Sequence, residues 1–297
     1  MPSTRDIRRR IKSIKNTAQI TKAMQLVAAA KMKKAQDQAT HGRPYAELLN
    51  KVLVSMREGI EEGAHPFFTE GKGGKTLVVL ISSDKGLCGA LNTNLFKKLL
   101  AADLQGEVEY VTVGRKGAQT LSRMRKKLIA DFPIKDPAKF LELRTVGNFV
   151  QEKYLTGEYA RVVVAFNNFI NTVTVVPTVE QLLPVNPVTL GGKRDYEGMT
   201  GIYEVKETSG DAPEYIFEPD ARTVFETILP QYVNNTLWQM LLEARASEHS
   251  SRMVAMKNAT DNAKQIIKDL TLEYNKLRQA AITNELLEIT TAKMALG

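Results

Sequence analysis

The sequence contains a single cysteine, Cys88, among its 297 residues. A lone cysteine excludes an internal disulfide and any cysteine-rich metal site, and it is consistent with a cytoplasmic location. The three histidines, His41, His65 and His249, lie outside the stretch that holds Cys88, so no base is at hand to activate the thiol. We therefore expect Cys88 to be a small buried core residue. No carboxylate pair, metal-ligand spacing or catalytic triad stands out elsewhere.

Long hydrophobic runs are also missing. No apolar segment approaches the roughly 20 residues that a membrane-spanning helix needs. The first residues, Met1 to Asp6, have no apolar segment typical of a signal or transit peptide, so we expect neither. With 43% hydrophobic and 25% charged residues, the composition indicates an ordinary soluble protein.

Glycine and proline are absent from residues 231–296. This stretch is rich in Ala, Leu, Met, Glu, Lys, Gln and Arg, which are the residues that lose least in a helix. As a single helix it would be about 100 Å long, which is too long for one globular domain of this size. We therefore expect a projecting rod whose hydrophobic residues need a cover.

Acidic residues are scarce near the N-terminus, where only Asp6 and Asp37 oppose eleven Lys and Arg up to Arg43. A basic helix favours an acidic partner, which can be nucleic acid, anionic lipid or a carboxylate-rich protein surface. A solvated face is the commoner explanation when charge is the only evidence.

The same N-terminal stretch carries the signals of a long helix. Ser3 and Asp6 form a capping-box pattern at its start. Apolar and small residues then recur in alternate steps of four and three, which is typical of a coiled coil: Ile7, Ile11, Ile14, Ala18, Thr21, Gln25, Ala28, Met32, Ala35 and Ala39. Ile20, Met24 and Val27 are expected to widen this face. Gly42 and Pro44 interrupt the pattern, and 45–57 is helical again.

The middle of the chain alternates between strand and helix patterns, which predicts an α/β domain with a mostly parallel sheet. Strands are expected at 76–81, 107–113, 161–166, 171–179 and 215–217, the fourth as an antiparallel partner. Helices are expected within 86–102 after a loop, at 116–127 and at 137–155. The stretch 184–213 is rich in glycine, proline and charge, which is typical of a loop or hairpin.

We therefore predict an α/β protein in which the N- and C-terminal helices form a long antiparallel coiled coil, with an inserted Rossmann-like α/β domain. The predicted divisions are an N-terminal coiled-coil helix at 1–57, the α/β domain at 75–217, and a C-terminal coiled-coil helix with a single-helix tip at 220–297.

The register of the coiled coil can be predicted if the two terminal helices leave the α/β domain side by side. With Gly42 beside Asn234, facing residue numbers sum to roughly 276. Met24 is then expected near Arg252, and Ser3 near Glu273. The C-terminal helix would extend past its partner by some 24 residues, or about 36 Å.

The C-terminal rod changes character along its length. Its facing stripe is expected to consist of small residues that permit close approach: Ala244, Ser247, Ser251, Ala255, Ala259 and Ala263. The overhang carries hydrophobic residues on several faces: Leu277, Ala280, Ile282, Leu286, Leu287, Ile289, Met294 and Leu296. Such a helix is normally buried, and the simplest cover is a sleeve supplied by another protein. Arg278, Gln279 and Thr283 would then face polar groups of that partner.

The loop 82–89 lies between a predicted strand and a predicted helix, where phosphate-binding loops occur. It lacks both the G-x-G-x-x-G and the G-x-x-x-x-G-K-[ST] patterns, so a nucleotide site is poorly supported. We favour a tight structural turn.

Several motifs together resemble the γ subunit of F-type ATP synthase, the central rotor shaft. They are Ile7 to Met24, Ser83 to Gly89, Arg252 to Ala263, and Asn275 to Thr283 followed by Glu285-Leu286. The resemblance covers both termini and the domain between them.

The resemblance implies a non-catalytic rotor subunit of a proton- or sodium-driven ATP synthase, without a cofactor. Its partners would be the α and β subunits of the catalytic hexamer, the ε subunit and the membrane c-ring, at the cytoplasmic face of the bacterial plasma membrane. Contact with β is expected at Arg278, Gln279, Thr283, Met24, Lys22 and Lys85. The side towards the c-ring is expected at Tyr215, Phe217 and Glu218.

Two other classes of function remain as alternatives. A basic coiled-coil protein that binds nucleic acid would show salt-sensitive affinity. An α/β nucleotide enzyme would hold a nucleotide in the isolated chain. The small-residue stripe and the apolar overhang argue against the nucleic-acid binder.

Overall fold

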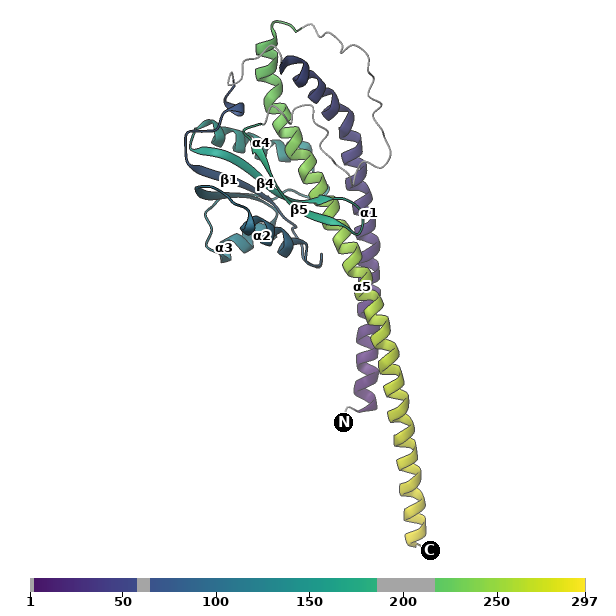
Figure 1. Ribbon diagram of the computed structural model, residues 1–297. Helices are drawn as coiled ribbons and strands as arrows, with labels where there is room; N and C mark the ends of the chain where they lie inside the picture. Colours follow the sequence, from purple (N-terminus) through teal and green to yellow (C-terminus); the bar gives the residue numbers. More distant parts are fainter. Residues whose placement is uncertain (1–2, 58–64, 186–216, 297) are drawn as a thin grey trace. The chain divides into compact units, whose positions relative to one another are not determined.

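The computed structural model describes residues 3–57, 65–185 and 217–296. The chain divides into two compact units, one made of residues 1–28 and 252–297 and the other of residues 29–251. Two long helices, α1 (Thr4–Arg57) and α5 (Ala221–Leu296), contribute to both units (Figure 1).

Each long helix begins at a polar cap. Ser3 Oγ accepts a hydrogen bond from the Asp6 amide (3.2 Å), and Asp6 Oδ2 accepts one from the Ser3 amide (3.3 Å), which confirms the capping box. Asp220 Oδ1 accepts a hydrogen bond of 2.8 Å from the amide of the third residue of α5. Neither helix ends at its proline, since Pro44 lies inside α1 and Pro230 inside α5. The helical segment predicted after Pro44 is therefore a continuation of α1.

In the first unit, α1 and α5 lie side by side and antiparallel (Figure 1). Every predicted seam position of α1 up to Ala28 is buried or half-buried, with Ile7 and Ala28 only 1% and 2% exposed. The Oγ1 atoms of Thr21 and Thr260 lie 2.7 Å apart in this seam. The coiled-coil pattern is confirmed.

The register differs from the prediction. Thr21 pairs with Thr260, and Arg8 donates a hydrogen bond to the Tyr274 hydroxyl, so facing residue numbers sum to 281 and 282 rather than 276. Met24 is therefore not level with Arg252, and the expected pairing of these two positions is wrong by more than one helical turn.

The physical reason is that the assumed anchor was misplaced. Gly42 does not mark the end of α1, because the helix continues to Arg57. In the second unit, a Cβ added at Gly42 would lie 3.0 Å from Gln239 Nε2, not beside Asn234.

The second unit contains a five-stranded sheet in the order β3-β2-β1-β4-β5. Its strands are β1 (Lys75–Ile81), β2 (Glu107–Val113), β3 (Leu128–Phe132), β4 (Tyr159–Phe169) and β5 (Val175–Leu183). The β1–β2, β1–β4 and β2–β3 pairs are parallel, and β4–β5 is antiparallel. This order confirms the Rossmann-like, mostly parallel sheet with one antiparallel edge.

The connecting elements are η1 (Pro66–Phe68), α2 (Leu91–Ala101), α3 (Arg115–Arg123) and α4 (Phe140–Leu155). The predicted helix 116–127 ends early, and β3 follows it as a strand that was not predicted. The chain turns at Arg125, which has a φ of 53°. All residues of β3 are half-buried or exposed, so the strand lacks the continuous apolar run that reveals a central strand.

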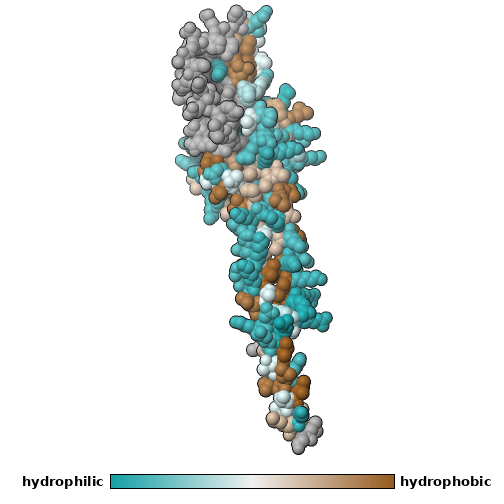
Figure 2. All heavy atoms as spheres, turned by 90° about the vertical axis from the view of Figure 1, so that its right-hand side faces the viewer, coloured by the Kyte–Doolittle hydropathy of each residue, from teal (hydrophilic) through white to brown (hydrophobic). Residues whose placement is uncertain are grey.

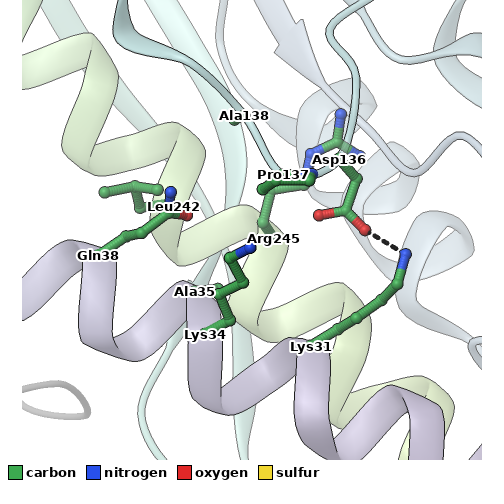
Figure 3. A pocket seen from close by; sticks show the side chains of 9 residues that line it. All are labelled: Lys31, Lys34, Ala35, Gln38, Asp136, Pro137, Ala138, Leu242 and Arg245. Atoms are coloured by element: carbon green, nitrogen blue, oxygen red, sulfur yellow. Dashed lines mark hydrogen bonds and ion pairs between the residues drawn. The ribbon is translucent and has the colours of Figure 1, made fainter.

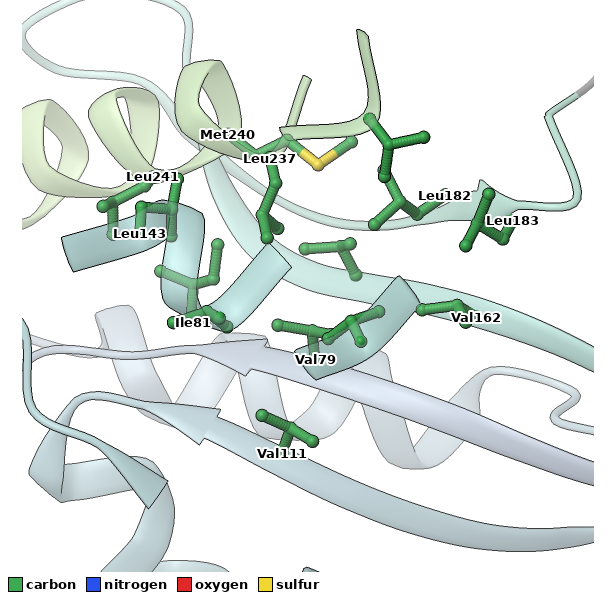
Figure 4. Close-up of a cluster of buried hydrophobic side chains, with 14 of the residues drawn as sticks. Val79, Ile81, Val111, Leu143, Val162, Leu182, Leu183, Leu237, Met240 and Leu241 are labelled. Carbon is green, nitrogen blue, oxygen red and sulfur yellow. The ribbon is translucent and has the colours of Figure 1, made fainter. Parts of the chain in front are cut away.

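The hydrophobic residues of β1 alternate between two cores because the strand is covered on both faces. Leu77, Val79 and Ile81 pack with α4 and the first part of α5, as Figure 4 shows for a set of these side chains. Val78 and Leu80 pack with α2 and α3 on the other face. The sheet therefore lies between two helical layers, and α5 is part of one of them.

This arrangement corrects the predicted small-residue stripe of α5 at two of its six positions. Ala244 belongs to the core formed with the sheet, and Ser247 Oγ donates a hydrogen bond of 2.9 Å to the Asn167 carbonyl of β4. These two residues thus face the α/β domain. Leu242 and Ala246 instead pack against Ala35 and Ala39 of α1, because the sheet already covers the face of α5 that carries Ala244 and Ser247.

Some predictions lie outside the described residues. Most of the predicted loop 184–213 is among them, as are Tyr215 and the residue after it in the predicted strand 215–217. Phe217 is described, is not in a strand, and packs half-buried against the larger core. Glu218 is exposed.

Candidate partner-binding surfaces and the socket of α5

The C-terminal end of α5 is a helix that no described part of the chain covers. Leu277 is the last half-buried residue, and every residue from Arg278 to Met294 is exposed. Large hydrophobic side chains among them are strongly exposed: Ile282 49%, Leu286 58%, Leu287 57%, Ile289 65% and Met294 85%. Figure 2 shows hydrophobic residues at this end of the helix. We call residues 278–296 the overhang; it begins about five residues later than predicted because of the register.

The polar groups of the overhang are placed on this exposed surface. Arg278 and Gln279 are exposed, as is Thr283. Thr283 Oγ1 donates to the Gln279 carbonyl at 2.9 Å. Its hydroxyl oxygen can still accept hydrogen bonds from a partner. All three groups can therefore contact a surrounding protein.

A second exposed apolar surface lies on α1 in the first unit. Ile20 and Val27 are 61% and 57% exposed, so they point away from the seam that they were expected to widen. Leu26 is 60% exposed, whereas Met24 is half-buried. Lys22 is exposed beside them and donates to Gln25 Oε1 at 3.3 Å. An apolar surface bordered by a cation suits a protein partner.

The basic residues of α1 divide between the two units. In the first unit Arg8 contacts Tyr274 through a hydrogen bond, and its guanidinium carbon lies 5.3 Å from the centre of the Tyr274 ring. In the second unit Lys33 and Lys34 are exposed, and Lys31 Nζ lies 2.6 Å from Asp136 Oδ2. Part of the basic face is thus used within the chain.

The loop 82–89 is a tight turn, as favoured from the sequence. Ser82 Oγ accepts a hydrogen bond of 2.7 Å from the Gly117 amide and donates one of 3.0 Å to the Gly114 carbonyl. Cys88 is 3% exposed, which confirms it as a buried residue, and Lys85 is exposed.

A cluster of buried charges was missed by the sequence analysis. Arg245 of α5 lies with its Nη1 3.2 Å from Asp84 Oδ2 and 3.0 Å from Glu248 Oε2. Its Nη2 donates to the Ile134 carbonyl at 2.8 Å. The side chains of Arg245 and Glu248 are only 5% and 6% exposed. Arg245 therefore joins α5 to the loops that follow β1 and β3.

A second group of charges lies beside the first. Asp136 Oδ2 binds Lys31 of α1 at 2.6 Å and lies 3.3 Å from His249 Nε2 of α5. The His249 ring and the Lys31 amine hold the pKa of Asp136 well below its usual range. Figure 3 shows Lys31 reaching Asp136 across a small cavity of about 170 Å³ that Arg245 also lines. We call Asp84, Ile134, Asp136, Arg245, Glu248 and His249, with Lys31, the α5 socket. Residues paired over such long distances in sequence leave no local sequence pattern by which the α5 socket could be predicted.

Neither a metal site nor a membrane span occurs in the part of the chain that the structure describes. Residues 3–57, 65–185 and 217–296 contain no group of three or more His, Cys, Asp and Glu side chains that could hold a metal ion. No helix within them is long and apolar enough to cross a membrane. A coiled coil with an exposed apolar helix end, in a chain that also carries an α/β domain, is typical of a subunit that works inside a larger assembly.

Comparisons with known proteins identify the family. A family model described as ATP synthase matches residues 3–296. The ATP synthase gamma chain of Opitutus terrae is 48% identical over 295 residues, covering 99% of each chain. That of Akkermansia muciniphila is 47% identical over 296 residues, covering 100% of each. The chain belongs to the ATP synthase gamma chains; it is a rotor subunit of that complex and not itself catalytic.

Solved structures agree with this assignment. A chain of the Tetrahymena thermophila mitochondrial ATP synthase, from a central stalk and c-ring structure, is 27% identical with a TM-score of 0.58, and the match covers 81% of this chain and 99% of that one. A chain of the Euglena gracilis mitochondrial enzyme has a TM-score of 0.65 at 19% identity, covering 99% and 94%, and supports the fold alone. Nothing in the comparisons supports the nucleic-acid alternative. The partners of the chain are other parts of a membrane-bound ATP synthase complex.

Proposed function

We propose that the overhang turns inside an apolar sleeve formed by the α and β subunits of the catalytic hexamer. The observation that carries this proposal is the exposure of every residue from Arg278 to Met294 on a helix that is hydrophobic on several faces. A patch of this kind on a protein surface marks an interaction site. The sleeve would bury it, and the turning helix would remain free of fixed bonds to any one partner.

The polar residues of the shaft would supply contacts that depend on its angle. Arg278, Gln279 and Thr283 would form directed hydrogen bonds with one β subunit at a time. Met24, Lys22 and Lys85 would contact acidic loops of β in the same manner. Each orientation then binds one conformation of each β site better than the others, which is the requirement for coupling two sites through a shared element.

The α/β domain would contact the ε subunit and the c-ring at the cytoplasmic face of the bacterial plasma membrane. Proton or sodium flow would turn the ring, and the chain would turn with it as a peripheral subunit. The central stalk and c-ring named for the Tetrahymena structure support this arrangement. Exposed Glu218 and half-buried Phe217 are the described residues that we assign to the side of the c-ring, together with Tyr215.

Co-purification tests the proposal directly. Replacing Leu286 and Leu287 together by Glu places charges in the sleeve, and we expect less α and β subunit in the purified complex and lower ATP synthesis in membrane vesicles. Leu141 and Leu155 of the α/β domain are 71% and 54% exposed, so their replacement by Glu is the matched control and should leave α and β bound. Wild-type amounts of α and β and full synthesis in the overhang variant would contradict the proposal.

A further inference from the structure

The strand order of the sheet defines an edge where related folds bind ligands. Helices α2 and α3 cover one face of the sheet, and α4 covers the other. The chain changes face between β1 and its neighbour β4. In open α/β sheets the ligand crevice lies outside the carboxyl ends of the strands at such a point.

The edge is occupied by the helix of the shaft itself. Three polar side chains of α5 bind groups at or beyond the carboxyl ends of the strands. Arg245 reaches Asp84 after β1 and the Ile134 carbonyl after β3. Ser247 bonds the Asn167 carbonyl near the end of β4 (2.9 Å), and Ser250 Oγ donates to the Thr172 carbonyl beyond it (2.6 Å). Helix α5 therefore lies at the edge of the sheet where related folds bind a ligand.

We propose that Arg245 is a positioning residue that fixes the angle of the α/β domain on α5, so that the domain and the helix turn as one body. This inference rests on the proposed rotor function. Arg245, at the carboxyl edge of the sheet, would then transmit torque between the α/β domain and α5.

The chemistry of the guanidinium suits a lock of this kind. Its planar donors bind two carboxylates and one carbonyl at once, and a point charge such as a lysine amine cannot match that geometry. Turning the helix against the domain would pull Arg245, whose side chain is only 5% exposed, away from Asp84 and the Ile134 carbonyl, in a place where water has little access to replace them. If only apolar contacts joined the helix to the domain, sliding or twisting the helix would cost less free energy.

The neighbouring charges extend the lock to the second helix. Asp136 follows β3, as Ile134 does, and it binds both Lys31 of α1 and His249 of α5. In addition Asp84 Oδ1 accepts a hydrogen bond of 3.2 Å from the Arg115 amide at the start of α3. A torque applied to the domain is therefore passed to both helices of the shaft through bonded groups.

The test compares Arg245→Met with Glu109→Gln in the complete complex. Glu109 is also a buried charge of the α/β domain, but it binds Lys127 (2.7 Å), Lys75 (3.2 Å) and Tyr159 (2.6 Å), all within the domain. ATP hydrolysis, proton or sodium pumping per ATP, the melting temperature, and the twisting fluctuations of single rotors with a probe on the c-ring would be measured. For Arg245→Met we expect hydrolysis to continue, pumping per ATP to fall severalfold, and the fluctuations to grow. Arg245→Lys should recover part of the loss.

For Glu109→Gln we expect a lower melting temperature with pumping per ATP unchanged. The inference is overturned if Arg245→Met pumps as well as the wild type, or if Glu109→Gln lowers pumping per ATP equally. If Arg245→Met does not assemble, Asp84→Asn keeps Arg245 paired with Glu248 and takes its place with the same expectations and the same overturning results. A wild-type complex that hydrolyses ATP without any pumping would instead contradict the proposed rotor function.

Discussion

Two segments of α5 differ in their exposure to solvent. Every residue from Leu241 to Ser250 is buried, although the segment contains Glu243, Arg245, Glu248 and His249. Every residue from Arg278 to Met294 is exposed, although that segment is rich in leucine and isoleucine.

The comparison shows that the hydropathy of a helical segment does not decide whether it is buried. The polar segment is buried because the strand ends provide acceptors for its side chains. The hydrophobic segment is exposed because nothing in residues 3–57, 65–185 and 217–296 covers it. The polar groups of the first segment find partners within the chain, and we propose that the second segment is covered by other subunits.

The largest effect on the stability of the chain is expected at Ser247, which is fully buried. Ser247→Leu adds volume to a filled site and removes the bond to Asn167, so the free energy of unfolding should fall by about 2–4 kcal/mol. Thr283→Leu in the overhang is the matched control and should change it by less than about 0.5 kcal/mol. Denaturant unfolding of the isolated chain measures both. Equal losses would mean that the two segments do not differ as described.

The overhang should show the reverse pattern, with a large effect on function and a small one on the chain. Replacing Arg278 and Gln279 together by Leu keeps helix propensity, so assembly should persist while ATP synthesis and single-molecule torque fall. Deleting residues 293–297 should be milder, because contacts in a sleeve are many and individually weak. If the deletion proves much more damaging than the double substitution, the essential contacts lie at the tip.

The α5 socket should make stability depend on acidity. The pKa of Asp136 is depressed in the folded chain below its ordinary value of 3.8 by His249 and Lys31. Its ionised form therefore adds stability above about pH 4, and this contribution is lost as the pH falls through and below that value. Asp136→Asn should flatten the acid-unfolding curve below pH 4. Glu285→Gln in the exposed overhang should leave the curve unchanged, and a flattening there would assign the effect to general charge.

The smallest effect is expected for a single charge on the surface of α1. Lys33→Gln should alter the unfolding free energy and ATP turnover little, since exposed ion pairs contribute about 0–1 kcal/mol. In a multiple variant, Glu replaces Lys33 and Lys34 and also Arg8, Arg9 and Arg10. This variant should turn over ATP more slowly, because the new carboxylates would repel acidic loops of β. Wild-type turnover in the multiple variant would show that this face is only solvated.

Features that depend on neighbouring residues were predictable from the sequence. The capping box at Ser3, the heptad seam and strands such as β1 arise from contacts over a few positions or from a simple periodicity. The early end of α3 and the strand β3 were missed, because a half-exposed edge strand has no strong pattern. The hydrophobic overhang was predictable from the sequence because the C-terminal helix extends past the N-terminal helix, which leaves its hydrophobic end without a partner helix.

Propensity and periodicity along the chain specify two long terminal helices, a mostly parallel sheet between them and a hydrophobic C-terminal end. The register and the α5 socket depend instead on contacts between residues far apart in sequence. Thr21 and Thr260 are 239 residues apart, and Asp84 and Arg245 are 161 apart. Local propensity and periodicity act over a few residues, whereas the position of one helix against another is set by the packing of the whole interface.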